Sequence, residues 1–370
     1  MIIIFLGGAL LICAELFFAF IYIKSRYGHN FYTLRSKFVV YRYDKLLGYR
    51  MAPNFRYSNP RLSYPRAPRK REFVDLRTDQ NGFLFDEDID RLIRIKKKIV
   101  FCLGGSTTAG LESAYDQTYP SQLDHLIQPL GYKSINAGLG GARSIHELLI
   151  FKHVILKYKP AAIVLFSGHN DYESYAYKVY APYNPYVHYL TMTLSRNIWE
   201  SVLSYSTLYF LIRKRFGITA NIRPNDTSRF QDVLDKPLWL EEWKSNIRQI
   251  IDACAENNIK CFLSSVVSPA YAHAPVEAKR LADSELDMNG RFDQWEQFNH
   301  LINDAASELC HDGAAHFIDV RPYFENYLSR FGSSDYFKER FSLFVDRVHF
   351  SELGNRILAQ AIYGLIGAKL

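Results

Sequence analysis

Short apolar runs alternate with amphipathic stretches along the chain after residue 95, a pattern typical of strands and helices that follow one another. Strands that are apolar throughout, and that are separated by helices, predict an α/β fold with a parallel sheet covered on both faces. The predicted strands span residues 99–103, 132–137, 161–167, 259–265 and 316–320, and the predicted helices span residues 119–130, 144–159, 241–258 and 351–368.

Two local signals refine this prediction. Ser144 and Glu147 have the spacing of a capping box, which would open the helix that runs to Lys159. Asn81-Gly82 is a turn signal upstream of the first predicted strand.

Residues 1–23 are almost wholly apolar and are interrupted only by Glu15. A run of this length spans a bilayer as a helix, and it lacks the charged leading segment of a cleaved signal peptide. We therefore predict a single-pass transmembrane anchor. Basic residues follow it closely, at Lys24, Arg26, Arg35, Lys37 and Arg42. Because Lys and Arg near a span stay in the cytoplasm, these charges favour a domain on the cytoplasmic face.

The rest of the chain divides by composition. Residues 24–95 form a basic, aromatic lead-in, in which the prolines between residues 61 and 71 interrupt helix and strand ladders alike. Residues 96–370 form the predicted catalytic domain, with an insertion at about residues 172–235. The start of the insertion is crowded with tyrosines, at Tyr172, Tyr175, Tyr177, Tyr180, Tyr183, Tyr186 and Tyr189. These rings are expected either at the mouth of the site or in an aromatic packing patch.

Composition excludes several classes of protein. The 370 residues are 48% hydrophobic and 22% charged, which is ample for a large buried core and unlike a disordered chain. The net charge of +7 is mild, and the basic residues form no nucleic-acid-binding motif, so nucleic acid is not an expected partner. The cysteines have neither metal-site spacing nor the pattern of a disulfide framework: Cys13, Cys102, Cys254, Cys261 and Cys310.

The first predicted strand ends in Gly104-Gly105-Ser106. A serine delivered on a tight glycine turn after a strand is how α/β hydrolases present a nucleophile. Two nucleotide-binding alternatives fail. A P-loop requires Lys and Ser or Thr where the chain has Leu111-Glu112, and a dinucleotide fingerprint that begins at Gly138 meets Arg143 in place of its last glycine. Ser106 is therefore the candidate nucleophile.

Three further polar clusters lie where a partner set for a serine is needed, at Asn136–Gly141, Gly168–Asp171 and Asp346–His349. The first two follow predicted strands, and the carboxyl ends of parallel strands form the edge at which α/β sheets bind ligands. Each cluster alone is compatible with a turn or a helix cap. The prediction of a site therefore depends on the clusters occurring together.

Cleavage of an ester by a serine needs a base, a group that orients the base, and N–H donors for the oxyanion. His349 is the candidate base and Asp346 the group that orients it. The candidate oxyanion donors are the Ser106 N–H, the Gly141 N–H and the Asn170 side-chain amide.

Together the clusters resemble the motifs of the SGNH (GDSL-type) hydrolase superfamily, with the blocks at Gly104–Thr107, Asn136–Gly141, Gly168–Asp171 and Asp346–His349. The resemblance implies a flavodoxin-like three-layer α/β/α sandwich, ester hydrolysis or acyl transfer, and no metal or cofactor. It departs from the namesake motif at Gly105, where that motif has Asp. It covers roughly residues 96–370 and does not reach the anchor, the lead-in or the insertion.

The function expected from the sequence is that of a membrane-anchored serine esterase. Its substrate would be an acyl ester, with O-acetyl favoured, on a glycan or a lipid-linked molecule. One alternative is a glycan O-acetyltransferase that uses the same triad. The other is a non-catalytic membrane-tethered glycan-binding or scaffold protein. The residues do not specify an oligomeric state. The resemblance to enzymes of envelope glycans favours the outer face of the membrane, against the charge rule.

Overall fold

A computed structural model describes residues 10, 13–17, 41–59, 74–111, 113–176, 182–185, 238–288, 290–332 and 335–370. The chain divides into two compact units, one formed by residues 1–52 with 185–223 and the other by residues 53–184 with 224–370. Every candidate site residue belongs to the second, larger unit.

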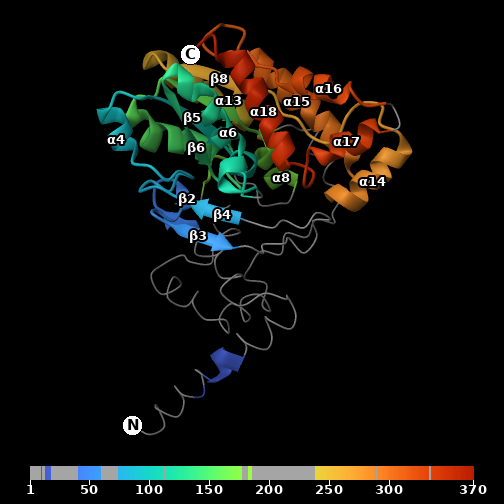
Figure 1. The fold of residues 1–370 in the computed structure, drawn as a ribbon, viewed down its shortest axis with the longest axis horizontal. Helices are drawn as coiled ribbons and strands as arrows, with labels where there is room; N and C mark the ends of the chain where they lie inside the picture. Colours follow the sequence, from blue (N-terminus) through green and yellow to red (C-terminus); the bar gives the residue numbers. More distant parts are fainter. Residues whose placement is uncertain are drawn as a thin grey trace. The chain divides into compact units, whose positions relative to one another are not determined.

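A five-stranded parallel sheet with the strand order β6-β5-β7-β8-β9 forms the centre of the larger unit (Figure 1). The strands are β5 (Lys98–Gly104), β6 (Tyr132–Gly138), β7 (Ala162–Phe166), β8 (Lys260–Ser264) and β9 (His316–Ile318). The first strand of the sheet lies between the second and the third, as in flavodoxin-like doubly wound sheets. The parallel α/β sheet predicted from the sequence is confirmed.

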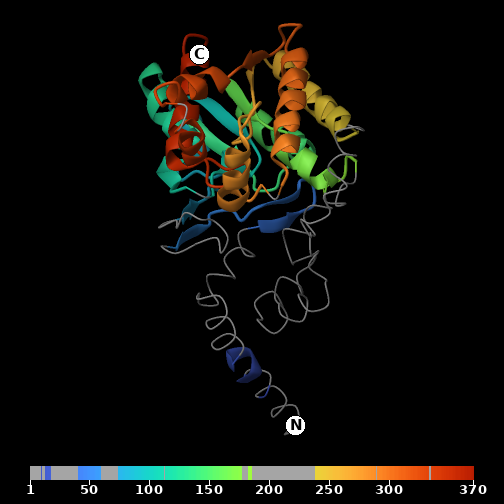
Figure 2. The same cartoon turned by 90° about the vertical axis from the view of Figure 1, so that its right-hand side faces the viewer.

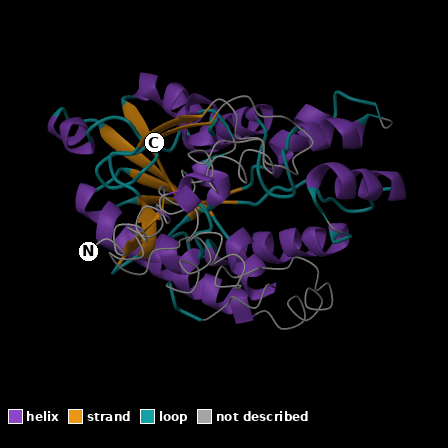
Figure 3. Cartoon of the chain, turned by 90° about the horizontal axis from the view of Figure 1, so that it is seen from below, coloured by secondary structure: helices purple, strands orange, loops and turns teal. Residues whose placement is uncertain are grey.

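Helices cover the sheet in two groups, which Figure 2 shows on opposite sides of the strands and Figure 3 shows around them. One group pairs α6 (Tyr119–Ile127) with α18 (Glu352–Ile366), and the other packs α13 (Leu238–Glu256) against α7 (Ser144–Ile150) and α15 (Phe292–Leu309). Both faces of β7 are therefore dry, and all its residues are buried. This burial explains why the strand is apolar throughout.

The remaining helical elements of this unit are shorter. They are α4 (Ile89–Arg94), α5 (Ser106–Ala109), η2 (Tyr115–Gln117), η3 (Gln128–Leu130), η4 (Phe151–Ile155), η5 (Leu156–Tyr158), α8 (His169–Ala176), α14 (Val276–Leu286), α16 (Arg321–Leu328) and α17 (Tyr336–Ser342). The helix predicted over residues 144–159 thus continues from α7 into a π-helical turn and a 3-10 turn. The helices α14 to α17 had no counterpart in the prediction.

The lead-in contains regular structure that its composition did not predict. In the smaller unit, β1 (Tyr41–Asp44) and β2 (Gly48–Met51) form an antiparallel hairpin. In the larger unit, β3 (Arg56–Asn59) pairs with β4 (Val74–Arg77). The proline-rich residues 61–71 lie outside the described residues.

The end of the lead-in also covers an edge of the main sheet. The turn expected at Asn81-Gly82 forms, with Gly82 N donating to Asp79 O over 3.1 Å. The chain then pairs with the edge strand β6, because Leu84 forms an antiparallel bridge to Asn136 with an N···O distance of 3.0 Å. The larger unit therefore begins well before residue 96.

Most of the predicted anchor, residues 1–23, lies outside the described residues, apart from Leu10 and the helical residues 13–17. In the part of the chain that the structure describes, no helix has the length and apolarity needed to cross a membrane.

Helix α8 continues to Ala176, so the first residues of the predicted insertion are helical. Tyr172 is fully buried and stacks on Phe298 with a centroid distance of 4.7 Å, as expected for a packing patch. Of the other insertion tyrosines, Tyr175 and Tyr183 are described, while Tyr177, Tyr180, Tyr186 and Tyr189 lie outside the described residues.

Candidate active site

The candidate nucleophile lies at the turn from β5 into α5. The strand ends at Gly104, Gly105 occupies the N-cap position, and Ser106 is the first residue of the short helix. Gly104 pairs with Gly138 of β6 and with Phe166 of β7. The segments that follow these strands therefore leave the sheet at the same edge, as the sequence predicted.

Ser106, His349 and Asp346 form one hydrogen-bonded chain. His349 Nε2 lies 2.8 Å from Ser106 Oγ, and His349 Nδ1 lies 2.7 Å from Asp346 Oδ2. The second carboxylate oxygen of Asp346 accepts the backbone N–H groups of Val348 and His349, at 2.9 and 2.8 Å. With Nδ1–H donating to the carboxylate, Nε2 is left as an acceptor for the serine hydroxyl. This arrangement can move a proton from Ser106 to His349.

Electrostatics keep Asp346 ionised. Burial raises the pKa of this carboxyl, but the His349 imidazole, its hydrogen bond and the Arg347 guanidinium together hold the pKa below its usual range. Arg347 also fixes the loop in place. Its Nε and Nη2 donate to Glu173 Oε1 of α8 at 2.9 and 2.6 Å, and its Nη1 lies 3.5 Å from Asp287 Oδ2.

The candidate oxyanion donors lie on two segments. Asn170 is in the first turn of α8, and its Nδ2 donates to Ala142 O over 2.8 Å, which orients the amide and leaves its second N–H for a ligand. Gly141, in the loop before α7, has a φ of 77°, which only glycine adopts readily. A Cβ on Gly105 would stand 2.4 Å from Asn170 Nδ2, so the amide packs directly on the glycine that precedes Ser106.

The predicted capping box at Ser144 and Glu147 is wrong. Ser144 is the first residue of α7, and the backbone N–H of the N-cap residue Arg143 is accepted by His146 Nδ1 at 3.1 Å. The Ser144 hydroxyl instead donates to Asp171 Oδ1 over 2.6 Å. The capping box was predicted because Ser144 precedes an apolar run. A serine at this position gives the same sequence pattern whether its hydroxyl bonds the backbone of its own helix or a residue of another segment.

Several polar contacts around the site were not predicted, namely those of Arg347 with Glu173 and those of Ser144 with Asp171. Their only sequence signal was position, because each residue stands next to a predicted site residue or a few places from one.

Two further observations concern ligands. Within the described ranges, no cluster of His, Cys, Asp and Glu has the arrangement of a metal site. A cleft of about 500 Å³ lies beside Asn136 and is lined by Phe85, Asp86, Tyr115 and Lys133 among others. None of Ser106, Asn170 and His349 lines it, so the candidate site is located by its chemistry rather than by that cavity.

Comparison with known proteins gives a family match over most of the chain. The model of the GDSL-like Lipase/Acylhydrolase family matches residues 102–357, a range that contains Ser106, Asn170, Asp346 and His349. Among curated proteins, no sequence matches the chain.

Solved structures resemble it at low identity. The acetyl xylan esterase AlAXEase is 18% identical, with 72% of this chain and 98% of that chain covered and a TM-score of 0.42. A catalytic mutant of Axe2, an acetylxylan esterase from Geobacillus stearothermophilus, is 15% identical, with 73% and 94% covered and a TM-score of 0.42. A GDSL-like lipase from Bacteroides thetaiotaomicron is 16% identical, with 76% and 98% covered and a TM-score of 0.39.

Replacing Gly105 by alanine tests the packing of the Asn170 amide. The added methyl must displace Nδ2, so kcat for a small acetate ester should fall by roughly 10²-fold with little change in KM, as when one oxyanion donor is removed. Gly332→Ala is the matched control, because its added Cβ meets nothing within 4 Å. A normal kcat in Gly105→Ala would contradict a role for the amide.

A second prediction concerns pH and stability. The pKa of Asp171 is raised to about 7, chiefly by burial and to a smaller extent by the negative charge of Glu242. The positive charge of Arg143 and the hydrogen bonds from Ser144 lower this pKa but do not cancel the rise. Burial and Asp171 likewise raise the pKa of Glu147 well above its usual range. Below about pH 7 the folded chain therefore holds a proton at Asp171, whereas the unfolded chain releases it near its ordinary pKa of 3.8. Stability falls as pH rises between these two values.

Asp171→Asn removes this titration. The difference in free energy of unfolding between the variant and the wild type should shift in favour of the variant, by on the order of 2 kcal/mol between about pH 5 and about pH 8. Urea unfolding of both proteins at the two pH values measures it. Parallel pH dependences would show that Asp171 does not titrate in this range.

Proposed function

The chain belongs to the GDSL-like lipase/acylhydrolase family. We propose that it is a serine esterase that uses Ser106, His349 and Asp346 to hydrolyse O-acyl esters. Membership makes it an ester-hydrolysing enzyme. The observation that supports these particular residues is the unbroken hydrogen-bonded chain from Ser106 Oγ through the imidazole to Asp346.

In the first half-reaction, Ser106 Oγ attacks the acyl carbonyl carbon while His349 Nε2 takes the hydroxyl proton. The negative charge that forms on the carbonyl oxygen is accepted by the N–H groups of Ser106, Gly141 and Asn170. The carbon–oxygen bond to the alcohol then breaks, His349 returns the proton to the leaving oxygen, and an acyl-serine remains.

In the second half-reaction, water takes the place of the alcohol. His349 removes a proton from the water, and the water oxygen attacks the acyl carbon. The bond from that carbon to Ser106 Oγ then breaks, the acyl group leaves as a carboxylic acid, and His349 returns the proton to Ser106 Oγ. A sugar hydroxyl in place of water would make the same residues an O-acetyltransferase. The proposed substrates are O-acetylated glycans or lipid-linked esters, a choice supported by the apolar N-terminal range that would hold the enzyme at a membrane.

The assignment is tested with the whole chain in detergent. Wild type should hydrolyse a small acetate ester and be labelled by a fluorophosphonate, while Ser106→Ala should lose labelling and lower kcat by roughly 10⁴–10⁶-fold. Ser329→Ala, an exposed serine, is the control. Labelling that persists in Ser106→Ala would refute the nucleophile. A wild type that neither hydrolyses nor is labelled would favour the scaffold alternative, and acyl transfer to an added glycan would favour the transferase.

We also propose that residues 1–23 anchor the protein in a membrane with the catalytic domain on the cytoplasmic side. The basic residues after the apolar run support this orientation. Alkaline phosphatase fused after Leu370 in a bacterial host should then be inactive, and a fluorescent protein fused at the same position should fluoresce. Phosphatase activity would place the domain outside and overturn the charge argument.

A further inference from the structure

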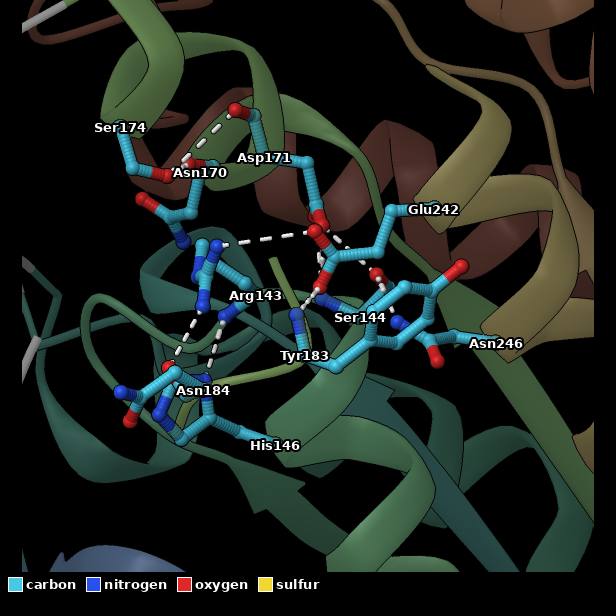
Figure 4. Close-up of polar contacts among 10 residues, drawn as sticks. All are labelled: Arg143, Ser144, His146, Asn170, Asp171, Ser174, Tyr183, Asn184, Glu242 and Asn246. Carbon is cyan, nitrogen blue, oxygen red and sulfur yellow. Dashed lines mark hydrogen bonds and ion pairs between the residues drawn. The ribbon is translucent and has the colours of Figure 1, made fainter. Parts of the chain in front are cut away.

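Two sets of hydrogen bonds join the loop after β6 to the start of α8, and Figure 4 shows the second of them. In the first, Asn170 Nδ2 donates to Ala142 O over 2.8 Å. In the second, the carboxylate of Asp171 accepts the Ser144 hydroxyl at 2.6 Å and the Ser144 backbone N–H at 3.0 Å. Asp171 directly follows Asn170, and Ser144 stands three residues after Gly141. The two segments are therefore tied together close to the donors that they carry.

The second link is buried and is surrounded by further hydrogen bonds. Asp171 is 2% exposed and Ser144 has no exposed surface. Asn246 of α13 donates to Ser144 Oγ over 3.0 Å, and Ser174 Oγ donates to Asn170 O. Hydrogen bonds to a carboxylate are shorter and stronger than neutral ones, and they strengthen further when water is excluded. The spacing of the two segments is consequently set by groups that have little freedom to move.

A buried arginine helps to keep Asp171 an acceptor. Burial favours the protonated acid and raises its pKa, while the positive charge of Arg143 opposes that rise. The Arg143 guanidinium is itself buried, lies 3.9 Å from the Glu242 carboxylate and donates to Asn184 O over 2.8 Å. Glu242 in turn accepts the Tyr183 N–H at 2.9 Å. None of these contacts competes for the bonds of Asp171 to Ser144, and of the two charges only that of Arg143 favours the ionised carboxylate, because Glu242 raises the Asp171 pKa.

We propose that Ser144 and Asp171 are positioning residues of the oxyanion hole, which set the separation between the Gly141 N–H and the Asn170 amide. The inference rests on the proposed esterase function. An oxyanion hole acts because its donors are in place before charge develops, and a misplacement of about 1 Å costs on the order of 10²-fold in rate. Above its raised pKa of about 7, Asp171 is a carboxylate that only accepts hydrogen bonds, and Ser144 offers it two donors.

Two substitutions test the link on a small acetate ester. Asp171→Asn places an amide N–H against the Ser144 donors or removes one acceptor, and kcat should fall on the order of 10²-fold with KM little changed. Ser144→Ala keeps the backbone N–H and loses the hydroxyl, so kcat should fall about tenfold. Ser265→Ala is the matched control: Ser265 is a fully buried serine whose hydroxyl accepts the Val320 N–H, outside this link, so kcat should be unchanged.

A double-mutant cycle separates positioning from a merely structural effect. If Ser144 acts through the Asn170 amide, the loss of kcat caused by Ser144→Ala should shrink severalfold in an Asn170→Ala background. An equal loss in both backgrounds, or a normal kcat in Ser144→Ala and Asp171→Asn, would overturn the inference.

The outcomes also distinguish this inference from the proposed function. Ser106-dependent hydrolysis with unaffected Ser144 and Asp171 variants would refute the positioning alone. A wild type without Ser106-dependent hydrolysis or labelling would refute both. A variant that does not fold, as judged by its thermal transition, is replaced by Asn246→Ala, which loosens the Ser144 hydroxyl from α13 and should lower kcat by a few-fold. An unchanged kcat in Asn246→Ala would then count against the inference.

Discussion

The parallel pairing of β5 with β7 is the constraint on which the site depends. It brings Gly104 and Phe166 into register, so the turn that carries Ser106 and the helix that carries Asn170 start from neighbouring strand ends. The order of strands reverses at this pair, which is where doubly wound sheets open a crevice for ligands. His349 and Asp346 come from the loop before the last helix, and Arg347 ties that loop to α8 through Glu173. Helix α8 is thus linked both to the loop that carries His349 and to the loop before α7.

The charged groups beside the site are almost wholly buried, and the Arg143 guanidinium lies 3.9 Å from the Glu242 carboxylate. Asp171, Arg143 and Glu242 are each nearly free of solvent contact. An isolated buried charge is very costly, and removing one partner of such a group leaves the other without compensation. The same feature that raises the pKa of Asp171 makes its bonds to Ser144 strong. A site that must hold donors still before reaction can make use of this rigidity.

The fold was predictable because a strand that is buried on both faces appears in the sequence as an uninterrupted apolar run. Each strand of the main sheet coincides with an apolar run that was predicted to be a strand. The observed and predicted ends of these strands differ by at most two residues. The contact of Ser106 with His349 joins positions far apart in the chain, and it could be expected only from the resemblance of four motifs taken together. Helix α14 was missed because its buried positions are mostly alanines, at Ala278 and Ala282, which give a weak apolar period.

Other features could not be read from local pattern. Ser144 has the same signature whether its hydroxyl caps its own helix or bonds Asp171, so only the tertiary structure separates the two. The partner of Arg347 is likewise a matter of packing between distant segments. Helix α15, by contrast, buries Phe292, Trp295, Phe298 and Ile302, a helical spacing that the sequence does display and that could have been recognised.

The bridge between Leu84 and Asn136 has a consequence for association between copies of the chain. Strand β6 ends the sheet on one side, and an open strand edge offers unpaired N–H and C=O groups to any neighbouring strand. Leu84 occupies part of that edge from within the same chain. A domain cut at residue 96 would lose this cover and present β6 to other molecules, whereas one that keeps residues 74–95 retains it. By pairing with β6, this part of the lead-in leaves less of the sheet edge open to pairing with another molecule.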